Sequence, residues 1–234
     1  LAIVFTAKIW NIGAEGQLYM GGMLAAILGT TLKDTPASVA LPVVVLLAGL
    51  GGAAWALAPA IARAYYGINE IITTLMLNYV ALYLVSYLLQ EPFRDPVSLF
   101  PETATLALTL WAPILAPGTR LHLGVAVAFF LVVPASYFFL KKTAFGLRFE
   151  ILGSNPRTAQ YAGINSNRLI VQAMLISGFL AGLAGGFEVL GIQHKMRLEI
   201  SPGYGYTGIA VALLGYLNPA LIAATSIFLG GVIN

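Results

Sequence analysis

Long apolar stretches, separated by short polar connections, occupy most of this chain. Five of them contain no Asp, Glu, Lys or Arg: residues 16–32, 35–62, 71–89, 121–140 and 169–187. A helix needs about 20 apolar residues to cross the hydrocarbon core of a bilayer. The apolar residues are continuous rather than alternating, which favours helices over the strands of a membrane barrel. The pattern therefore predicts an all-α integral membrane protein, a polytopic helical bundle.

Two further charge-free segments do not fit a simple crossing. Residues 200–234 are too long for one span, and they are interrupted by Gly203, Gly205, Gly215 and Pro219. We expect a broken or re-entrant helix there, followed by a final span. Residues 103–119 predict a folded loop instead of a span, because they contain Pro113, Pro117 and Gly118.

Composition agrees with a membrane protein and excludes other classes. Of the 234 residues, 59% are hydrophobic and 9% are charged, and the mean hydropathy is +0.87. Soluble domains contain about 25% charged residues, so a soluble enzyme, a nucleic-acid-binding domain and a disordered chain are excluded. The chain has no cysteine, hence no disulfide framework and no thiolate metal site. Both ends lie inside apolar stretches, so we expect one transmembrane domain over residues 1–234, truncated at both ends.

One connection, residues 141–168, holds much of the positive charge. It contains one acidic residue, Glu150, and five basic ones: Lys141, Lys142, Arg148, Arg157 and Arg168. Five minus one gives +4, more than the +3 of the whole chain. Because positively charged loops stay in the cytoplasm, we place residues 141–168 and 63–70 inside. Residues 33–34, 91–120 and 191–199 then lie outside.

The inner connection contains the signals of a short helix. Asn155 is a favoured N-cap, and Pro156 suits the first helical position. Gly163 suits the residue just past the helix end. A helix of about seven residues is unstable alone in water. We therefore expect it to pack on the bundle or on a partner protein; a surface turn within the loop is the simpler alternative.

Polar groups interrupt the apolar pattern between Asn11 and Gln17. This stretch, NIGAEGQ, combines a carboxyl group, two amides and two glycines. An ionisable group within lipid costs at least about 2.5 kcal/mol. Glycines there permit an unwound helix whose backbone faces protein or a water-filled cavity. Glu15 either caps a half-helix by accepting its N–H groups or contacts substrate, and the two roles are compatible.

A second glycine-rich interruption is GYGYTG, residues 203–208, which contains Tyr204 and Tyr206. Each interruption is expected to be followed by a short apolar half-helix rich in Ala and Gly. Paired interruptions in the two halves of a chain point to the pathway of a transporter. The pattern predicts an internal repeat, although the similarity between the two segments is weak residue by residue.

A third polar group lies at the start of the 71–89 stretch. Glu70, Thr74 and Asn78 are spaced four apart and share one helix face, with Thr73 at its border and Asn69 just before it. Hydrogen bonding between helices is the expected role of such a face, ahead of substrate contact by any one residue. A separate glycine series, Gly178, Gly182 and Gly186, predicts close helix packing. The sequence shows no P-loop, metal-ligand spacing or Ser/His/Asp grouping, so we expect no catalytic site and no metal site.

Five motifs, in this order, resemble the permease subunits of bacterial ABC importers: NIGAEGQ, NEIITTLMLNY, GLRFEILGSNPRTAQYAGI, SGFLAGLAGG and GYGYTGIAVALLGYLNP. The similarity is greatest to permeases for simple sugars and nucleosides, within the larger family that also serves branched-chain amino acids. It extends from Asn11 to Asn234.

The resemblance implies a multi-pass permease of the bacterial cytoplasmic membrane that moves a nucleoside or a simple sugar. The implied partners are two cytoplasmic ABC ATPases, a second identical or homologous permease, and an extracytoplasmic substrate-binding protein. ATP would bind the ATPases, and this chain would carry no cofactor and hydrolyse nothing. The inner helix would be the coupling helix, which assigns ATPase docking to Asn155, Pro156, Arg157, Ala159, Gly163 and Ile164. The expected substrate pathway comprises Asn11, Glu15, Gln17, Asn69, Thr74, Asn78, Tyr204 and Tyr206.

Three other classes of membrane protein are alternatives to an ABC permease, and each would require a different sequence feature. An ion-coupled secondary transporter would need a carboxylate at membrane depth, for which Glu15 is the candidate. An intramembrane enzyme would need a paired catalytic group at depth. A purely structural subunit would need no broken helices.

Overall fold

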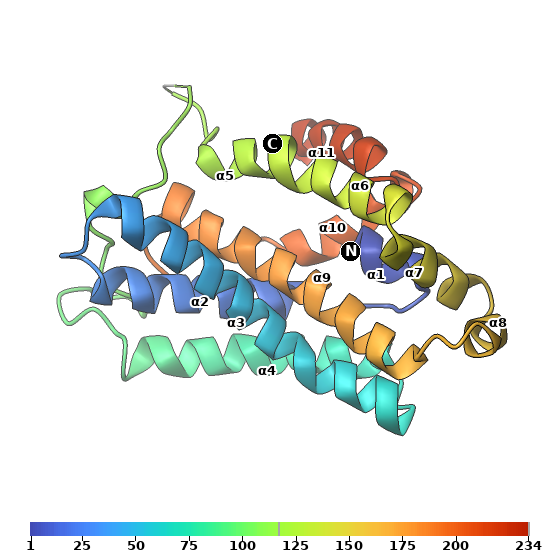
Figure 1. Cartoon of the computed structure of the whole chain (residues 1–234). Helices are drawn as coiled ribbons and strands as arrows, with labels where there is room; N and C mark the ends of the chain where they lie inside the picture. Colours follow the sequence, from blue (N-terminus) through green and yellow to red (C-terminus); the bar gives the residue numbers. More distant parts are fainter. Residues whose placement is uncertain (117, 234) are drawn as a thin grey trace.

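The structure, a computed structural model, describes residues 1–116 and 118–233. Pro117 and Asn234, which belong to the predicted outer loop and the predicted final span, lie outside the described residues. The α-helices are α1 (Ala2–Thr6), α2 (Ala14–Thr31), α3 (Ala37–Tyr66), α4 (Glu70–Gln90), α5 (Leu123–Val127), α6 (Val133–Lys142), α7 (Ala144–Ser154), α8 (Pro156–Tyr161), α9 (Ser166–Glu188), α10 (Tyr204–Leu214) and α11 (Pro219–Ile233). Shorter turns of other helix types are η1 (Leu108–Leu110), η2 (Ala128–Val132) and η3 (Val189–Gln193). The predicted all-α polytopic bundle is confirmed (Figure 1).

Four continuous helical segments of the described chain are long and apolar enough to cross a bilayer. They are α3, α4, the run Leu123–Lys142 formed by α5, η2 and α6, and the run Ser166–Gln193 formed by α9 and η3. All four correspond to predicted spans. The fifth predicted span, residues 16–32, forms α2. This helix has 18 residues, but it is less apolar than the four segments above and is not counted with them. Twelve of its residues are buried, so α2 contacts protein instead of lipid and does not need an apolar outer surface.

Glycines allow α2, α3 and α9 to pack closely at the centre of the bundle. A Cβ atom at Gly182 of α9 would lie 2.4 Å from the carbonyl oxygen of Ala48 on α3. A Cβ atom at Gly21 of α2 would lie 2.4 Å from the Cα atom of Gly182. Small residues let helix backbones approach in this way in membranes, where van der Waals packing holds helices together. The predicted packing role of the Gly178, Gly182 and Gly186 series is confirmed.

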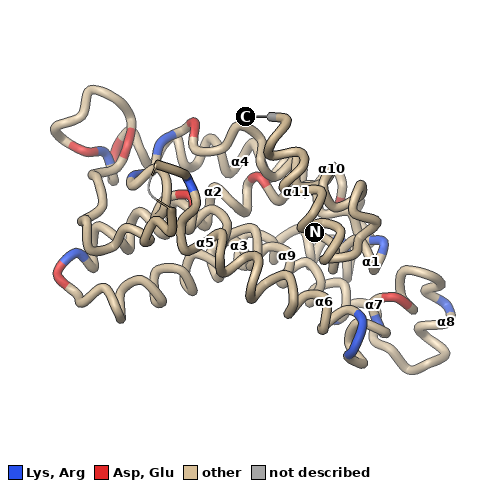
Figure 2. Tube along the Cα trace, turned by 90° about the horizontal axis from the view of Figure 1, so that it is seen from above, with Lys and Arg blue, Asp and Glu red and all other residues tan. Residues whose placement is uncertain are grey.

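Charged residues gather at the two ends of the bundle, and its middle is almost free of them (Figure 2). The helices α7 and α8 lie at one end, and the connections 32–36 and 91–112 lie at the other (Figure 1). The connection 141–168 was expected to contain one short helix but contains two. The additional helix, α7, begins where the Thr143 side chain accepts a hydrogen bond from the N–H of Gly146 at 3.2 Å.

Residues 102–112, in the loop between α4 and α5, pack on η3 and on the residues that follow it. The Thr103 N–H donates to the Met196 carbonyl at 3.0 Å, and the Met196 N–H donates to Thr103 Oγ1 at 2.9 Å. Beside this pair, Lys195 Nζ lies 2.7 Å from Glu102 Oε1. The hydrogen bond from Lys195 holds the pKa of the Glu102 carboxyl below its usual value. The predicted folded loop is confirmed for its described residues.

Candidate functional site

An unwound segment, residues 7–13, separates the short helix α1 from α2. Lys8 turns the chain at the end of α1 with a φ of 53°. Residues 9–12 have no regular secondary structure, so most of their backbone groups have no helical partners and must bond elsewhere. The break in the helix predicted around Asn11 is therefore present. The hydrogen bonds of this unwound segment define the polar cluster described next.

One face of α4 satisfies the backbone of the unwound segment. The Glu70 carboxylate accepts from the Trp10 N–H at 3.3 Å, and Thr74 Oγ1 accepts from the Ile12 N–H at 3.2 Å. Four helical residues rise about 6 Å, which matches the length of about two extended residues. Polar side chains four residues apart on α4 therefore bond to backbone N–H groups two residues apart on the unwound segment.

Asn78 continues this face one turn further. Its Nδ2 donates to the Ile12 carbonyl at 2.9 Å, and its Oδ1 accepts from the Gly16 N–H at 2.9 Å. Nδ2 also donates to the hydroxyl of Tyr206 on α10 at 3.1 Å. The expected role in hydrogen bonding between helices is thus confirmed for Asn78, which bonds to α2 and α10, whereas Thr74 bonds to the unwound segment.

The opposite side of the unwound segment contacts α9. Asn11 and Gln17 exchange two amide hydrogen bonds, of 3.0 and 3.1 Å. Asn11 Nδ2 also donates to Ser177 Oγ of α9 at 3.0 Å. Ser177 is buried and had not been assigned a role from the sequence, because a single serine in an apolar helix has no distinctive pattern.

Glu15 joins the beginnings of two helices. It lies in the first turn of α2, and its Oε2 accepts from the N–H of Gly205, in the first turn of α10, at 2.6 Å. A helix N-terminus carries partial positive charge, so two such ends stabilise one buried carboxylate. The predicted capping of a half-helix by Glu15 is confirmed. The half-helix is α10, with 11 residues, whereas the expectation of a second one after Gln17 is wrong because α2 continues for 18 residues.

The structure brings most of the predicted pathway residues together, but not all. Asn11, Glu15, Gln17, Thr74 and Asn78 are buried in the polar cluster, and Tyr206 reaches it from α10. Asn69 lies apart and exposed, where its side chain accepts from the Ile71 N–H and caps α4. Tyr204 lines a cavity of about 210 Å³ between α1, α2, α9 and α10, together with Ser177.

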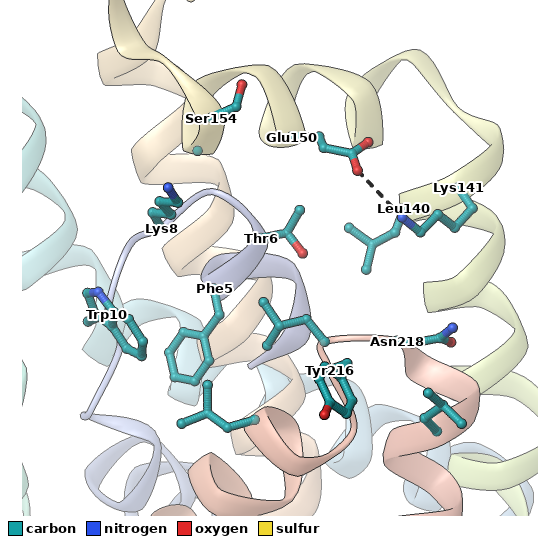
Figure 3. A pocket seen from close by; sticks show the side chains of 14 residues that line it. Phe5, Thr6, Lys8, Trp10, Leu140, Lys141, Glu150, Ser154, Tyr216 and Asn218 are labelled. Carbon is teal, nitrogen blue, oxygen red and sulfur yellow. Dashed lines mark ion pairs between the residues drawn. The ribbon is translucent and has the colours of Figure 1, made fainter.

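A larger cavity of about 630 Å³ lies at the end of the bundle that carries α7 (Figure 3). Side chains of α1, α6, α7 and the turn between α10 and α11 surround it, and an ion pair between Lys141 and Glu150 crosses its rim at 3.6 Å. On its wall, α7 touches the end of α1 so closely that a Cβ atom at Gly153 would lie 2.2 Å from the Thr6 carbonyl oxygen. The unwound segment starts immediately after this contact.

The predicted short helix forms α8, and its start and stop signals act as expected. Asn155 Oδ1 accepts from the N–H groups of Arg157 at 2.9 Å and Thr158 at 3.3 Å. Gly163 follows the helix with a φ of 69°. Ala159 is fully buried against the bundle, whereas Tyr161 is 92% exposed. The helix is therefore anchored on one side, and its other side is exposed.

Discontinuous helices whose ends meet in a polar cluster at membrane depth are typical of membrane transporters. Comparison with known proteins agrees, since residues 1–234 match the family described as the permease component of branched-chain amino acid transport systems. The chain belongs to this family. No solved structure matches the chain significantly.

Three curated relatives show which proteins the chain is similar to. It is 35% identical to the guanosine ABC transporter permease protein NupP of Bacillus subtilis, over 99% of this chain and 67% of the relative. It is 36% identical to the glucose ABC transporter permease protein TsgB13 of Haloferax volcanii, over 95% of this chain and 60% of the relative. It is 31% identical to the nucleoside ABC transporter permease protein NupB of Lactococcus lactis, over 93% of this chain and 62% of the relative. The chain thus spans about two thirds of the length of these relatives.

Proposed function

We propose that this chain is the transmembrane permease part of an ATP-driven ABC importer that moves a nucleoside or, as the second choice, a simple sugar. The observation that carries the proposal is α8, a capped helix anchored by Ala159 at one end of the bundle with Tyr161 exposed. A helix of six residues does not persist in water unless it packs on something. Its exposed side suits a cytoplasmic ATPase, and the family membership supports that partner.

The contacts around α8 suggest how movement would reach the polar cluster. Only Asn155 separates α8 from α7, and α7 presses on the end of α1 through Gly153. The unwound segment follows directly and leads to Glu15 and the start of α10. ATP-driven closure of the ATPases would move α8, and the packed backbones of α7 and α1 would shift the junction of α2 and α10. This junction would then open towards one side of the membrane or the other.

The polar cluster favours a neutral solute over an amino-acid zwitterion. Its carboxylates are both engaged, Glu15 with the Gly205 N–H and Glu70 with Arg63, whose Nε lies 3.2 Å from Glu70 Oε2. Neither is left to hold a charged substrate group. Amides and hydroxyls suit the many hydroxyl groups of a nucleoside or sugar, and permeases named for guanosine, nucleosides and glucose are among the relatives.

The decisive test is ATP hydrolysis by the assembled importer. The full-length permease would be reconstituted with its second permease subunit, the ABC ATPases and the extracytoplasmic binding protein. The binding protein would be loaded in turn with nucleosides, pentoses, hexoses and branched-chain amino acids. We expect nucleosides to stimulate hydrolysis. If no ATPase co-purifies and no solute stimulates hydrolysis, the proposal fails, and ion-coupled transport through Glu15 is tested next.

Gly163→Trp tests the docking role of α8. Gly163 has a positive φ and open space around it, so the bulky side chain would project from the α8 surface. We expect the amount of co-purifying ATPase to fall at least about tenfold, a loss of about 1.4 kcal/mol of binding free energy. Gly118→Trp is the matched control, because Gly118 also has a positive φ and open surroundings but lies in the loop between α4 and α5, which was predicted to be outside. Equal ATPase recovery from both variants would contradict docking at α8.

A further inference from the structure

Three tyrosines form a row along the exposed face of α4. Tyr79, Tyr83 and Tyr87 are four residues apart, so they lie one above the other on the helix. Their exposed fractions are 51%, 72% and 61%. This face lies away from the polar face that holds the unwound segment, and among the described residues nothing hydrogen-bonds to the three phenol groups.

Two of these tyrosines lie too deep for the aromatic belts of a membrane protein. Tyrosine is enriched where the bilayer meets water. Tyr79 lies about 14 Å from the Glu70 end of α4 and about 17 Å from its Gln90 end, at 1.5 Å per residue. Tyr83 lies about 11 Å from the Gln90 end. Only Tyr87 is near a bilayer surface, so two phenol hydroxyls would face hydrocarbon if lipid covered this face.

Exposed positions near the middle of two other apolar helical segments carry the hydrocarbon side chains expected next to lipid. Phe130 and Leu131, in the span formed by α5, η2 and α6, are 84% and 63% exposed. Ile227 and Phe228 of α11 are 63% and 69% exposed. None of these side chains carries a hydroxyl group. The face of α4 therefore differs from them in chemistry at the same exposure.

The tyrosine row is continuous with the polar cluster. Tyr79 follows Asn78, whose amide donates to the hydroxyl of Tyr206. Tyr206 is itself 41% exposed, so the hydrogen-bonded cluster reaches the outside of this chain beside α4. The tyrosine row on the surface of α4 is thus directly next to the buried amides of the polar cluster.

We propose that the exposed face of α4 lines a water-filled part of the transport pathway, where Tyr79 and Tyr83 stack on the flat ring of the solute. The opposite wall is the second permease subunit, so the inference rests on the proposed importer with two permeases and a nucleoside as its solute. Stacking of a base on an aromatic side chain tolerates different bases and releases them readily when few contacts are made. The tyrosine hydroxyls hydrogen-bond to water or to the hydroxyl groups of the solute.

Cysteine labelling tests whether water reaches this face. The 234 residues contain no cysteine, so Tyr79→Cys and Tyr83→Cys can be introduced singly into a full-length permease free of other cysteines. Phe130→Cys and Ile227→Cys serve as the controls. A membrane-impermeant maleimide would be added to the assembled transporter in liposomes, with and without guanosine-loaded binding protein. We expect labelling at 79 and 83, slowed by guanosine, and none at the control positions.

Each other result of the labelling overturns the inference. Absence of labelling at 79 and 83 shows a lipid-covered face, and equal labelling at the control positions shows no distinct pathway. Labelling that guanosine does not slow overturns the stacking. The reaction with maleimide does not depend on ATP hydrolysis, so it separates a failure of this inference from a failure of the proposed importer.

Uptake kinetics provide a second measurement for Tyr83. We expect Tyr83→Phe, which retains the ring, to change the KM for guanosine less than about twofold, whereas Tyr83→Leu raises it at least about fivefold. Phe130→Leu should leave the KM unchanged. An unchanged KM in Tyr83→Leu, with the protein assembled normally, would overturn the role of this ring.

Discussion

Gly185→Val is expected to prevent the permease from folding into a stable bundle. A Cβ atom at Gly185 would lie 2.0 Å from the carbonyl oxygen of Leu18 and 2.9 Å from the Gly22 nitrogen, both backbone atoms of α2. Backbone cannot rotate away as a side chain can, so α2 and α9 would have to separate. Overpacking of this kind costs about 3 kcal/mol or more. The measurement is the yield of monodisperse protein in detergent and its midpoint of thermal unfolding.

Gly231→Val is the control for this substitution. Gly231 lies in α11, and a Cβ atom there meets nothing within 4 Å. Its free energy of unfolding, judged from the midpoint of thermal unfolding, should change by less than about 0.5 kcal/mol. Similar yields and midpoints for the two glycine variants would show that α2 and α9 do not pack as closely as described.

Glu15→Leu is expected to abolish uptake and to lower the free energy of unfolding by about 1–3 kcal/mol, because the Gly205 N–H loses its acceptor. Glu15→Gln retains an oxygen that can accept this hydrogen bond, so we expect it to keep measurable uptake and most of the stability. Glu150→Gln is the control. Its carboxylate is 57% exposed and pairs with Lys141 at 3.6 Å, so uptake and stability should stay near wild type.

The comparison of the two Glu15 variants separates the two transport mechanisms. A capping carboxylate can be replaced by an amide, whereas an ion-coupling carboxylate needs its charge and its exchangeable proton. Loss of all uptake in Glu15→Gln, with the fold intact, would therefore favour ion coupling over the ABC mechanism. The readouts are uptake into liposomes and thermal unfolding of the same preparations.

Local signals in the sequence were sufficient for several features. Asn155, Pro156 and Gly163 define the limits of α8, because capping depends on residues within one helical turn. The spacing of Glu70, Thr74 and Asn78 identified one polar face, because helical periodicity alone places them together. The helix α7 was missed although Thr143 caps it, since its charged residues made the whole connection look like a loop.

The partners of those polar groups were not predictable from the sequence. The acceptor on α4 for the Ile12 N–H lies 62 residues away, and the donor to Glu15 lies 190 residues away. No local pattern encodes such pairings. Ser177, which completes the bonds of Asn11, lies in an apolar stretch and becomes recognisable only when α9 packs against the unwound segment.

By itself, the sequence determined the class of protein, the limits of most spans, the break before α2, the short inner helix and the family. These features depend on hydropathy, on helical periodicity and on capping, which act over one or a few turns. Only the tertiary structure decided that α2 is a full-length buried helix, that Glu15 joins α2 to α10, and that the tyrosines of α4 remain exposed. The physical reason is that burial and hydrogen bonding between helices depend on which helix faces pack together. That packing is determined jointly by residues that are far apart in the chain.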